Sequence, residues 1–276
     1  MIVQTLKLDN KNGFNFDLIF YQRAEISKQK QQNPLMLIFA GGSFTSLSKR
    51  EQEPIALKYL SEGFNVALVN YNLLTQNVPL FPNAALCGFA AIEHFRTNMQ
   101  EYHINANQII TAGFSAGGAV VGIMNSIIND STFLQKHNLD PNKIKPNGSI
   151  LGYPLLELAS LKAPYPPSFQ QWVPSEPFYQ NANLGVGSLT PPTFLFHTAN
   201  DDLVPVSNTL NYAQTLNKYH IPFEVHIYPM GVHGIATARK ISATDRTGEI
   251  NPSVATWMSL SLTWLELVLS ISSRLN

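Results

Sequence analysis

The sequence predicts an α/β fold, with a mostly parallel central sheet, an antiparallel hairpin at the N-terminus and helices on both faces. Short apolar stretches alternate along the chain with longer stretches of helical character, which is typical of parallel strands joined by right-handed crossovers. Residues 34–39 are continuously apolar, as expected of a strand covered on both faces. Near the N-terminus, 2–8 and 14–21 alternate in polarity around the turn sequence Asp-Asn-Lys-Asn-Gly, which indicates a hairpin.

Each expected element follows from these patterns in order along the chain. The expected strands are 2–8, 14–21, 34–39, 65–70, 108–112, 148–151, 193–197 and 223–228. The expected helices are 50–62, 84–98, 116–129, 206–219 and 252–270. Because all of them belong to one alternating series, we expect residues 1–276 to form a single domain, within the size range of α/β folds.

The charge balance excludes partners that bind by electrostatic attraction. The chain has 18 basic and 18 acidic residues, so nothing in it would attract a nucleic acid or an anionic membrane surface. The N-terminus lacks the pattern of a secretory signal. The apolar tract 257–271 is interrupted by polar residues and is shorter than a membrane crossing. We therefore expect a cytoplasmic protein in which 257–271 is a packed terminal helix.

The single cysteine, Cys87, excludes an internal disulfide and agrees with a reducing compartment. No glycine-rich turn surrounds it. We interpret Cys87 as a small buried hydrophobic residue rather than as a catalytic thiol.

One segment, 153–192, interrupts the alternation. It carries eight prolines, a density that prevents long regular elements, and its aromatic residues include Phe169, Trp172 and Phe178. A long irregular connection inside an α/β domain usually has a function, so we expect 153–192 to form a cap or one wall of a pocket. The alternative is a surface excursion that these aromatic residues only anchor.

The motif that predicts the chemistry is Gly-Phe-Ser-Ala-Gly at 113–117, between the expected strand 108–112 and the following helix. In that position G-x-S-x-G is a nucleophile elbow, a strained turn that presents the hydroxyl of Ser115 beyond the sheet edge, at the positive end of a helix. Glycines two residues before and after are expected because side chains there would collide with backbone. The alternative, a glycine-rich turn that only packs the helix on the strand, explains the context less well.

A serine nucleophile needs a base that a carboxylate orients, and with this elbow the chain order is serine, acid, histidine. Asp201 and Asp202 follow the expected strand 193–197. We expect one of them to be the acid and the other to form the turn or cap the next helix. His233 lies in a glycine-flanked loop after the last strand, where the base belongs. His197, at a strand end, is interpreted as a pocket or core residue.

An acyl-transfer site also needs amides that hold the oxyanion of the tetrahedral intermediate. The residue after the nucleophile, Ala116, supplies one in this type of site. The others are expected from the loop Ala-Gly-Gly-Ser-Phe at 40–44, which follows an early strand, and we select Gly42 and Ser43. The alternative for this glycine pair is an ordinary turn.

Together these motifs resemble a known group, the bacterial esterases of the α/β-hydrolase fold that are related to acetyl esterases, xylan esterases and the hormone-sensitive-lipase-like branch. The matching stretches are 40–44, 49–56, 69–71, 113–118, 201–205 and 232–234. In such esterases the acid stands three residues before a Val-Pro pair, and this implies Asp201 rather than Asp202. This chain departs from the family pattern at Ala40 and Ser43, where relatives usually carry His or Pro and a third glycine.

The resemblance further implies removal of short acyl groups, often acetyl, from sugars or small esters, without metal or cofactor, by a homo-oligomer (dimer or tetramer). We therefore predict a serine carboxylesterase that acts through an acyl-enzyme on Ser115, with Phe44, Tyr71 and Phe178 lining the substrate pocket.

Two other classes of protein stay open. A serine peptidase of the prolyl-oligopeptidase type shares the chain order, but the sequence has no propeller-sized domain. A binding protein on a hydrolase scaffold would not require all three catalytic residues.

Overall fold

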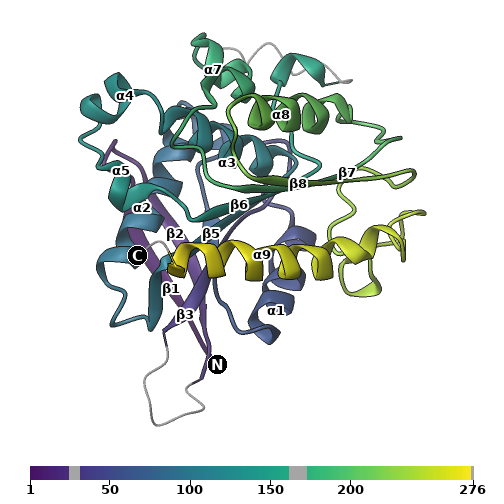
Figure 1. Ribbon diagram of the computed structural model, residues 1–276, viewed down its shortest axis with the longest axis horizontal. Helices are drawn as coiled ribbons and strands as arrows, with labels where there is room; N and C mark the ends of the chain where they lie inside the picture. Colours follow the sequence, from purple (N-terminus) through teal and green to yellow (C-terminus); the bar gives the residue numbers. More distant parts are fainter. Residues whose placement is uncertain (25–31, 162–172, 275–276) are drawn as a thin grey trace.

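A sheet of eight strands runs through the computed structural model, which describes residues 1–24, 32–161 and 173–274 (Figure 1). The strands are β1 (Ile2–Asp9), β2 (Asn15–Gln22), β3 (Asn33–Phe39), β4 (Asn65–Asn70), β5 (Ile104–Phe114), β6 (Gly148–Gly152), β7 (Thr193–Thr198) and β8 (Phe223–Tyr228). Their order in the sheet is β1-β2-β4-β3-β5-β6-β7-β8. β1 and β2 form an antiparallel hairpin, β2 pairs antiparallel with β4, and the remaining neighbours are parallel. The predicted sheet is thereby confirmed.

Helices cover both faces of this sheet. They are α1 (Glu53–Ser61), α2 (Asn83–Thr97), α3 (Ala116–Ile127), α4 (Ser131–Lys136), α5 (Pro141–Ile144), α7 (Pro177–Gln180), α8 (Ser207–Lys218) and α9 (Trp257–Arg274). Short 3₁₀ turns occupy Lys49–Glu51, Leu74–Gln76, Leu158–Ser160, Ala182–Gly185, Lys240–Ser242 and Val254–Thr256. The five predicted helices correspond to α1, α2, α3, α8 and α9, whereas α4, α5 and α7 were not predicted because each is six residues or shorter.

The alternation of side chains along β3 divides the interior into two cores. Leu37 and Phe39 point into the core that α2, α3 and α8 cover. Met36 and Ile38 point into the core under α1 and α9 on the opposite face. Figure 1 shows α9 along one side of the sheet, with α3 and α8 on the other. A strand with both faces buried explains the uninterrupted apolar run at 34–39.

Two predicted element boundaries are wrong for local reasons. The expected helix 50–62 is divided at Gln52, whose φ of −100° and ψ of −101° are not helical. α1 starts after it with Pro54 in its first turn, a position that proline favours because the amide there has no helical acceptor. At the other end of the chain, the helix expected from 252 becomes regular only at Trp257, after a 3₁₀ turn.

The terminal helix α9 packs against the sheet as expected. Trp257, Trp264 and Leu265 are buried in the core that α1 also covers. In the part of the chain that the structure describes, no helix combines the length and the apolar character needed to cross a membrane.

The proline-rich segment is only partly described, because residues 162–172 lie outside the described ranges, and with them Phe169 and Trp172. Before the gap, the chain forms the 3₁₀ turn Leu158–Ser160, and after it come α7 and a second 3₁₀ turn. Tyr179 of α7 is buried in the core of α2 and α3. At this end the segment is anchored to the domain through an aromatic side chain. Its role as a cap stays a prediction.

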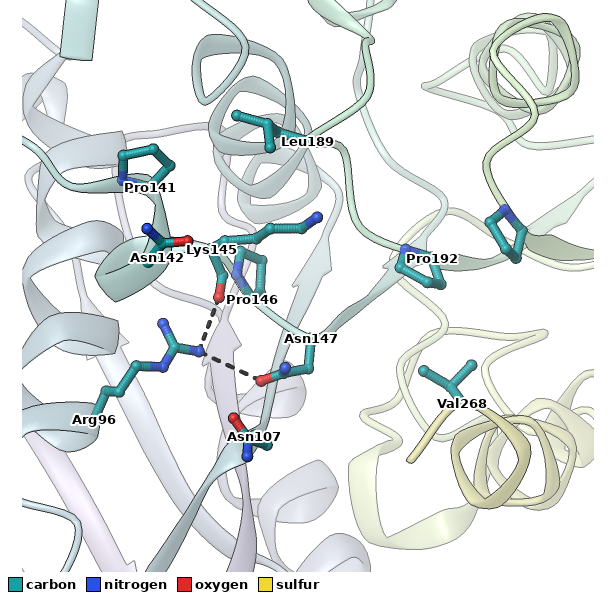
Figure 2. Close-up of a pocket in the computed structure, with 11 residues that line it drawn as sticks. Arg96, Asn107, Pro141, Asn142, Lys145, Pro146, Asn147, Leu189, Pro192 and Val268 are labelled. Carbon is teal, nitrogen blue, oxygen red and sulfur yellow. Dashed lines mark hydrogen bonds between the residues drawn. The ribbon is translucent and has the colours of Figure 1, made fainter. Parts of the chain in front are cut away.

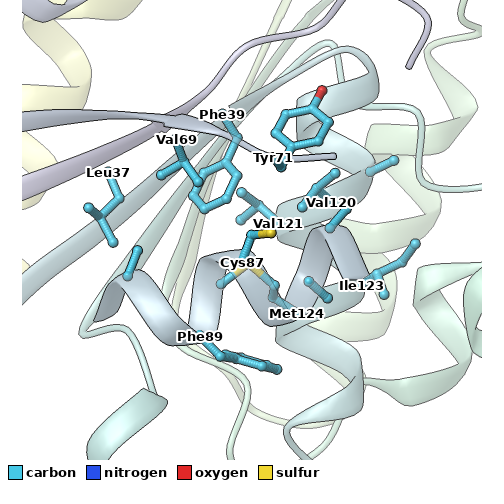
Figure 3. Close-up of a cluster of buried hydrophobic side chains, with 14 of the residues drawn as sticks. Leu37, Phe39, Val69, Tyr71, Cys87, Phe89, Val120, Val121, Ile123 and Met124 are labelled. Atoms are coloured by element: carbon cyan, nitrogen blue, oxygen red, sulfur yellow. The ribbon is translucent and has the colours of Figure 1, made fainter. Parts of the chain in front are cut away.

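Cys87 lies in the middle of α2 and is fully buried (Figure 3). Figure 3 shows its side chain among Phe39, Val121 and Met124. Burial raises the pKa of the Cys87 thiol to about 12, because a thiolate is disfavoured in apolar surroundings. The interpretation of Cys87 as a small buried hydrophobic residue is confirmed.

We predict that Cys87 resists alkylation in the folded protein, since the reactive species is the exposed thiolate. Incubation with iodoacetamide at pH 8, followed by intact-mass measurement, should give at least about 100-fold slower labelling in buffer than in 8 M urea. Equal rates in the two conditions would show that the cysteine is accessible in the native state.

Candidate active site

Ser115 occupies the sharp turn between β5 and α3. Its φ of 52° and ψ of −118° lie outside the regions that L-residues favour. The Ser115 amide donates to the Gly152 carbonyl at 3.1 Å, and the Ser115 carbonyl accepts from the Leu155 amide, also at 3.1 Å. Backbone bonds to the chain after β6 therefore hold the strained residue on both sides, at the amino end of α3.

The glycines around Ser115 are required by close backbone packing. A Cβ on Gly117 would lie 2.0 Å from the carbonyl oxygen of Phe39, and one on Gly113 would lie 2.5 Å from the carbonyl oxygen of Gly117. Neither space can hold a methyl group. The expectation that side chains at these positions would collide with backbone is confirmed.

Three polar side chains meet at the carboxyl edge of the sheet. The Ser115 hydroxyl lies 2.7 Å from Nε2 of His233, and Nδ1 of His233 lies 2.8 Å from Oδ2 of Asp201. These residues follow β5, β8 and β7, and carboxyl ends of parallel strands meet at one edge. The structure thus brings together the three side chains that the sequence selected.

The partners of His233 determine where its proton lies. An ionised carboxylate can only accept, so Nδ1 must carry the proton that is donated to Asp201. In the neutral imidazole Nε2 is then an acceptor, and it faces the hydroxyl of Ser115. His233 is therefore oriented to remove the proton of Ser115.

Asp201 is buried, and hydrogen-bond donors surround its carboxylate. Oδ1 accepts from the amides of Leu203 and Val204 at 2.9 and 2.8 Å, while Oδ2 faces His233 and also Nε2 of His197 at 3.3 Å. Burial by itself would raise the pKa of Asp201, but the hydrogen bonds from His197 and His233 outweigh it and hold that pKa well below its ordinary value. Asp201 remains ionised and keeps His233 in the required tautomer.

The neighbouring carboxylate, Asp202, holds the backbone that carries the histidine. Its Oδ1 accepts from the His233 amide at 3.0 Å, and its Oδ2 accepts from Nη2 of Arg246 at 2.6 Å. Arg246 also donates to the His233 carbonyl. Of the two alternatives for the second aspartate, capping of the next helix is wrong, because α8 is preceded by Val206 and has no side-chain cap. The side-chain bonds that close the turn come from Asp201 itself, to the amides of Leu203 and Val204.

The loop 40–46 lies directly against Ser115, and hydrogen bonds to its backbone carbonyls hold it in place. A Cβ on Gly41 would lie 2.8 Å from Cβ of Ser115. The Tyr71 hydroxyl donates to the Ala40 carbonyl at 2.6 Å, and the Ser48 amide donates to the Gly41 carbonyl at 2.9 Å. This backbone therefore has a defined position beside Ser115.

Three amides near Ser115 have no acceptor within the described ranges. They belong to Gly42, Ser43 and Ala116. Gly42 and Ser43 have φ values of 127° and 54°, which turn successive amides away from an extended course. Peptide N–H groups without a protein acceptor are suited to hold a developing oxyanion, and two of these three belong to the loop whose Gly41 packs against Ser115.

The three residues expected to line a pocket occupy different environments. Tyr71 and Phe44 are buried, and Tyr71 supports the Ala40 carbonyl. Phe44 packs edge-on against Phe81, which stacks on Tyr179, and Tyr179 contacts the half-buried Phe178. Phe44 and Phe178 thus lie at the two ends of one aromatic cluster, formed by Phe44, Phe81, Phe178 and Tyr179, whereas Tyr71 lies under the loop 40–46.

A cavity of about 500 Å³ opens at the opposite edge of the sheet, near the amino ends of β5 to β8 (Figure 2). Arg96 and Lys145 are among its lining residues, and Arg96 donates to the Lys145 carbonyl and to Oδ1 of Asn147, so it serves the local fold. Ser115 lies at the other edge. Among the residues described, no group of three or more His, Cys, Asp or Glu side chains is placed to hold a metal ion.

Several polar contacts around the three side chains were not predicted from the sequence, although His197 was interpreted as a pocket or core residue and is fully buried. His197 accepts from the Thr209 hydroxyl or donates to it at 2.8 Å and reaches Asp201 through its other nitrogen. Glu51 and Tyr153 are buried beside Ser115 and His233 and are bonded to each other. The only sequence signal for Glu51 was its place in the family-like stretch 49–56, and Tyr153 had none.

Comparison with known proteins identifies relatives over most of the chain. The BD-FAE family model matches residues 24–171, just over half of the chain, and a model of the prolyl oligopeptidase family matches residues 159–247. The acetylxylan esterase of Xylanibacter ruminicola is 24% identical over 247 residues, which are 85% of this chain and 48% of that protein. The chain spans 32% to 50% of the length of the curated relatives that it matches.

Solved structures match at nearly full length. The carboxylesterase Cest-2923 of Lactobacillus plantarum WCFS1 superposes with a TM-score of 0.90 at 29% identity, covering 96% of this chain and 97% of that one. The acetyl ester-xyloside bifunctional hydrolase of Caldicellulosiruptor lactoaceticus superposes with a TM-score of 0.74 at 29% identity, covering 95% and 91%.

The packing around Ser115 leads to a stability prediction. Gly117→Ala should lower the free energy of unfolding by about 3 kcal/mol or more, because β3 or α3 must shift to admit the methyl group. Urea unfolding measures this change. Gly148→Ala is the matched control, since a Cβ on that buried glycine meets only side-chain atoms at 3.3 Å and beyond. Equal losses in the two variants would contradict the packing argument.

Proposed function

Because the chain belongs to the BD-FAE family and has the α/β-hydrolase fold, we propose that it is a carboxylesterase in which Ser115, His233 and Asp201 form the catalytic triad. The observation that carries the proposal is the continuous hydrogen-bonded series from the Ser115 hydroxyl through His233 to Asp201, with distances of 2.7 and 2.8 Å. A nucleophile, a base and an orienting acid in this arrangement support acyl transfer.

The reaction has two steps. His233 takes the hydroxyl proton while Ser115 attacks the ester carbonyl, and the amides of Gly42, Ser43 and Ala116 stabilise the oxyanion. The protonated imidazole, held by Asp201, then gives its proton to the departing alcohol. Water, activated by the same imidazole, hydrolyses the acyl-enzyme and restores Ser115.

The substrates are short-chain acyl esters, mainly acetyl esters, of small molecules or sugars. The names of the acetylxylan esterase and the acetyl ester-xyloside hydrolase support acetylated carbohydrates as the alcohol side. The aromatic cluster that begins at Phe44, within the loop 40–46, supports a pocket wall that is apolar, with Tyr71 beneath the loop and Phe178 at the other end of the cluster. The resemblance to homo-oligomeric esterases leads us to propose a dimer or tetramer.

A serine peptidase is the second candidate function. It is favoured by the match of the prolyl oligopeptidase family model to residues 159–247, which include Asp201 and His233. Amide hydrolysis needs the same triad but a different leaving group, so the substrate distinguishes the two functions.

The triad assignment predicts unequal effects of its members and of their neighbour. Ser115→Ala should lower kcat for p-nitrophenyl acetate by roughly 10³-fold or more. Asp201→Asn should lower it by about 10⁴-fold, because an amide no longer selects the required tautomer of His233. Asp202→Asn is the control: it keeps an oxygen for the His233 amide, and its kcat should stay within about tenfold of wild type. If Asp202→Asn is the more damaging change, the two aspartates have exchanged roles.

The choice between the two functions predicts a substrate preference. The protein should hydrolyse p-nitrophenyl acetate with kcat/KM at least about 10³-fold above that for an aminoacyl p-nitroanilide. It should also release acetate from acetylated xylo-oligosaccharides, which an acetate assay quantifies. Faster cleavage of the anilide than of the ester would replace the esterase proposal with the peptidase.

A further inference from the structure

Glu51 is a buried carboxyl that the proposed mechanism does not use. It ends the 3₁₀ turn Lys49–Glu51, is 2% exposed and lies inside the stretch 49–56. Its Oε2 accepts from the Gly41 amide at 2.6 Å. The space at Cα of Gly41 is bounded by Oε2 of Glu51 on one side and Cβ of Ser115 on another, each within 3 Å of where a Cβ would stand. Glu51 therefore sets the position of the backbone next to the nucleophile.

The second oxygen of Glu51 leads to the other side of the site. Its Oε1 accepts from the Tyr153 hydroxyl at 2.8 Å, and the Tyr153 oxygen accepts from the Ala236 amide at 3.0 Å. The Tyr153 ring packs edge-on against the imidazole of His233, with centroids 5.3 Å apart. One continuous hydrogen-bonded series therefore connects the loop 40–46 with the loop that carries His233.

Burying a carboxyl group is unfavourable unless its partners compensate. Burial raises the pKa of Glu51, and the hydrogen bonds from Tyr153 and Gly41 offset this only in part. The neighbouring Arg50 is paired with Glu249 at 2.7 Å rather than with Glu51. An apolar residue at this position would avoid the desolvation, so the presence of Glu51 calls for a role in which acceptor atoms matter.

We propose that Glu51 and Tyr153 form a buried positioning pair, which fixes the amides of the loop 40–46 against Ser115 and the imidazole of His233 for the same reaction. The proposal rests on the esterase function and adds residues that touch no substrate. The loop 40–46 and the loop that carries His233 are both connected through the carboxyl group of Glu51. Removing this group should therefore displace the oxyanion donors and the base together. A displacement of about 1 Å in such groups lowers turnover by about 100-fold.

The test compares Glu51→Gln, Glu51→Leu and Tyr153→Phe, with kcat and KM for p-nitrophenyl acetate measured separately. Glu51→Leu removes both acceptors and should lower kcat about 100-fold, with KM changed less than about threefold. Glu51→Gln keeps one acceptor for Gly41 and should lose only about tenfold. Tyr153→Phe should also lose about tenfold, and combined with Glu51→Leu it should add little, since both act in one series.

The matched control is Glu249→Gln, which alters a carboxyl of equal burial that bonds Arg50 and Thr244. It should lower Tm as Glu51→Gln does but leave kcat within about threefold of wild type. If folded Glu51→Gln and Tyr153→Phe both match this control in kcat, the positioning role is wrong although the esterase stands. A wild-type protein no faster than Ser115→Ala would overturn the esterase function and the inference with it.

Discussion

The turn at Ser115 is the constraint from which the rest of the site is built. Its backbone adopts a conformation that an L-residue avoids, and such strain persists only where the surroundings over-determine it. Here β3 approaches so closely that Gly117 has no room for a side chain, and bonds to Gly152 and Leu155 hold the backbone of Ser115 from β6. Burial of β5 and α3 in the cores supplies the free energy that offsets the strain. The close approach of β3 and the bonds from Gly152 and Leu155 therefore fix the position of the Ser115 hydroxyl.

Beside that turn, the loop after β7 is hydrogen-bonded to the loop after β8 through three successive residues. Asn200, Asp201 and Asp202 each accept a hydrogen bond from the loop after β8, through the Gly231 amide, the His233 ring and the His233 amide. The carboxylate of Asp201 is buried and would be unstable without partners, yet the amides of its own loop and the ring of His197 also face it. The position of His233 is therefore fixed by backbone as well as by side chain.

Patterns within a short window of sequence were enough for most of the fold and for three site residues. Continuous apolar runs identified the strands, and G-x-S-x-G between a strand and a helix identified Ser115. The chain order expected with this elbow pointed to His233 and to one of Asp201 and Asp202, and the resemblance to bacterial esterases then implied Asp201. The roles of Glu51 and Tyr153 and the contact of His197 with Asp201 were not predicted, because these partners are created by tertiary packing: Glu51 bonds to a residue 102 positions away. The sequence also did not predict the interruption of the helix at Gln52, because the backbone dihedral angles of one residue leave no periodic signal.

The proposed catalytic residues stand on the connections after β5, β7 and β8, whereas the two cores consist of strands and helices. Substitutions in these loops can therefore change which ester is accepted, while the strands and helices of the two cores keep their cooperative unfolding. Glu51 and Gly41 limit that freedom. The Gly41 amide is bonded to the buried carboxylate of Glu51, so a substitution at either position would disturb the loop 40–46 unless the other position changed with it.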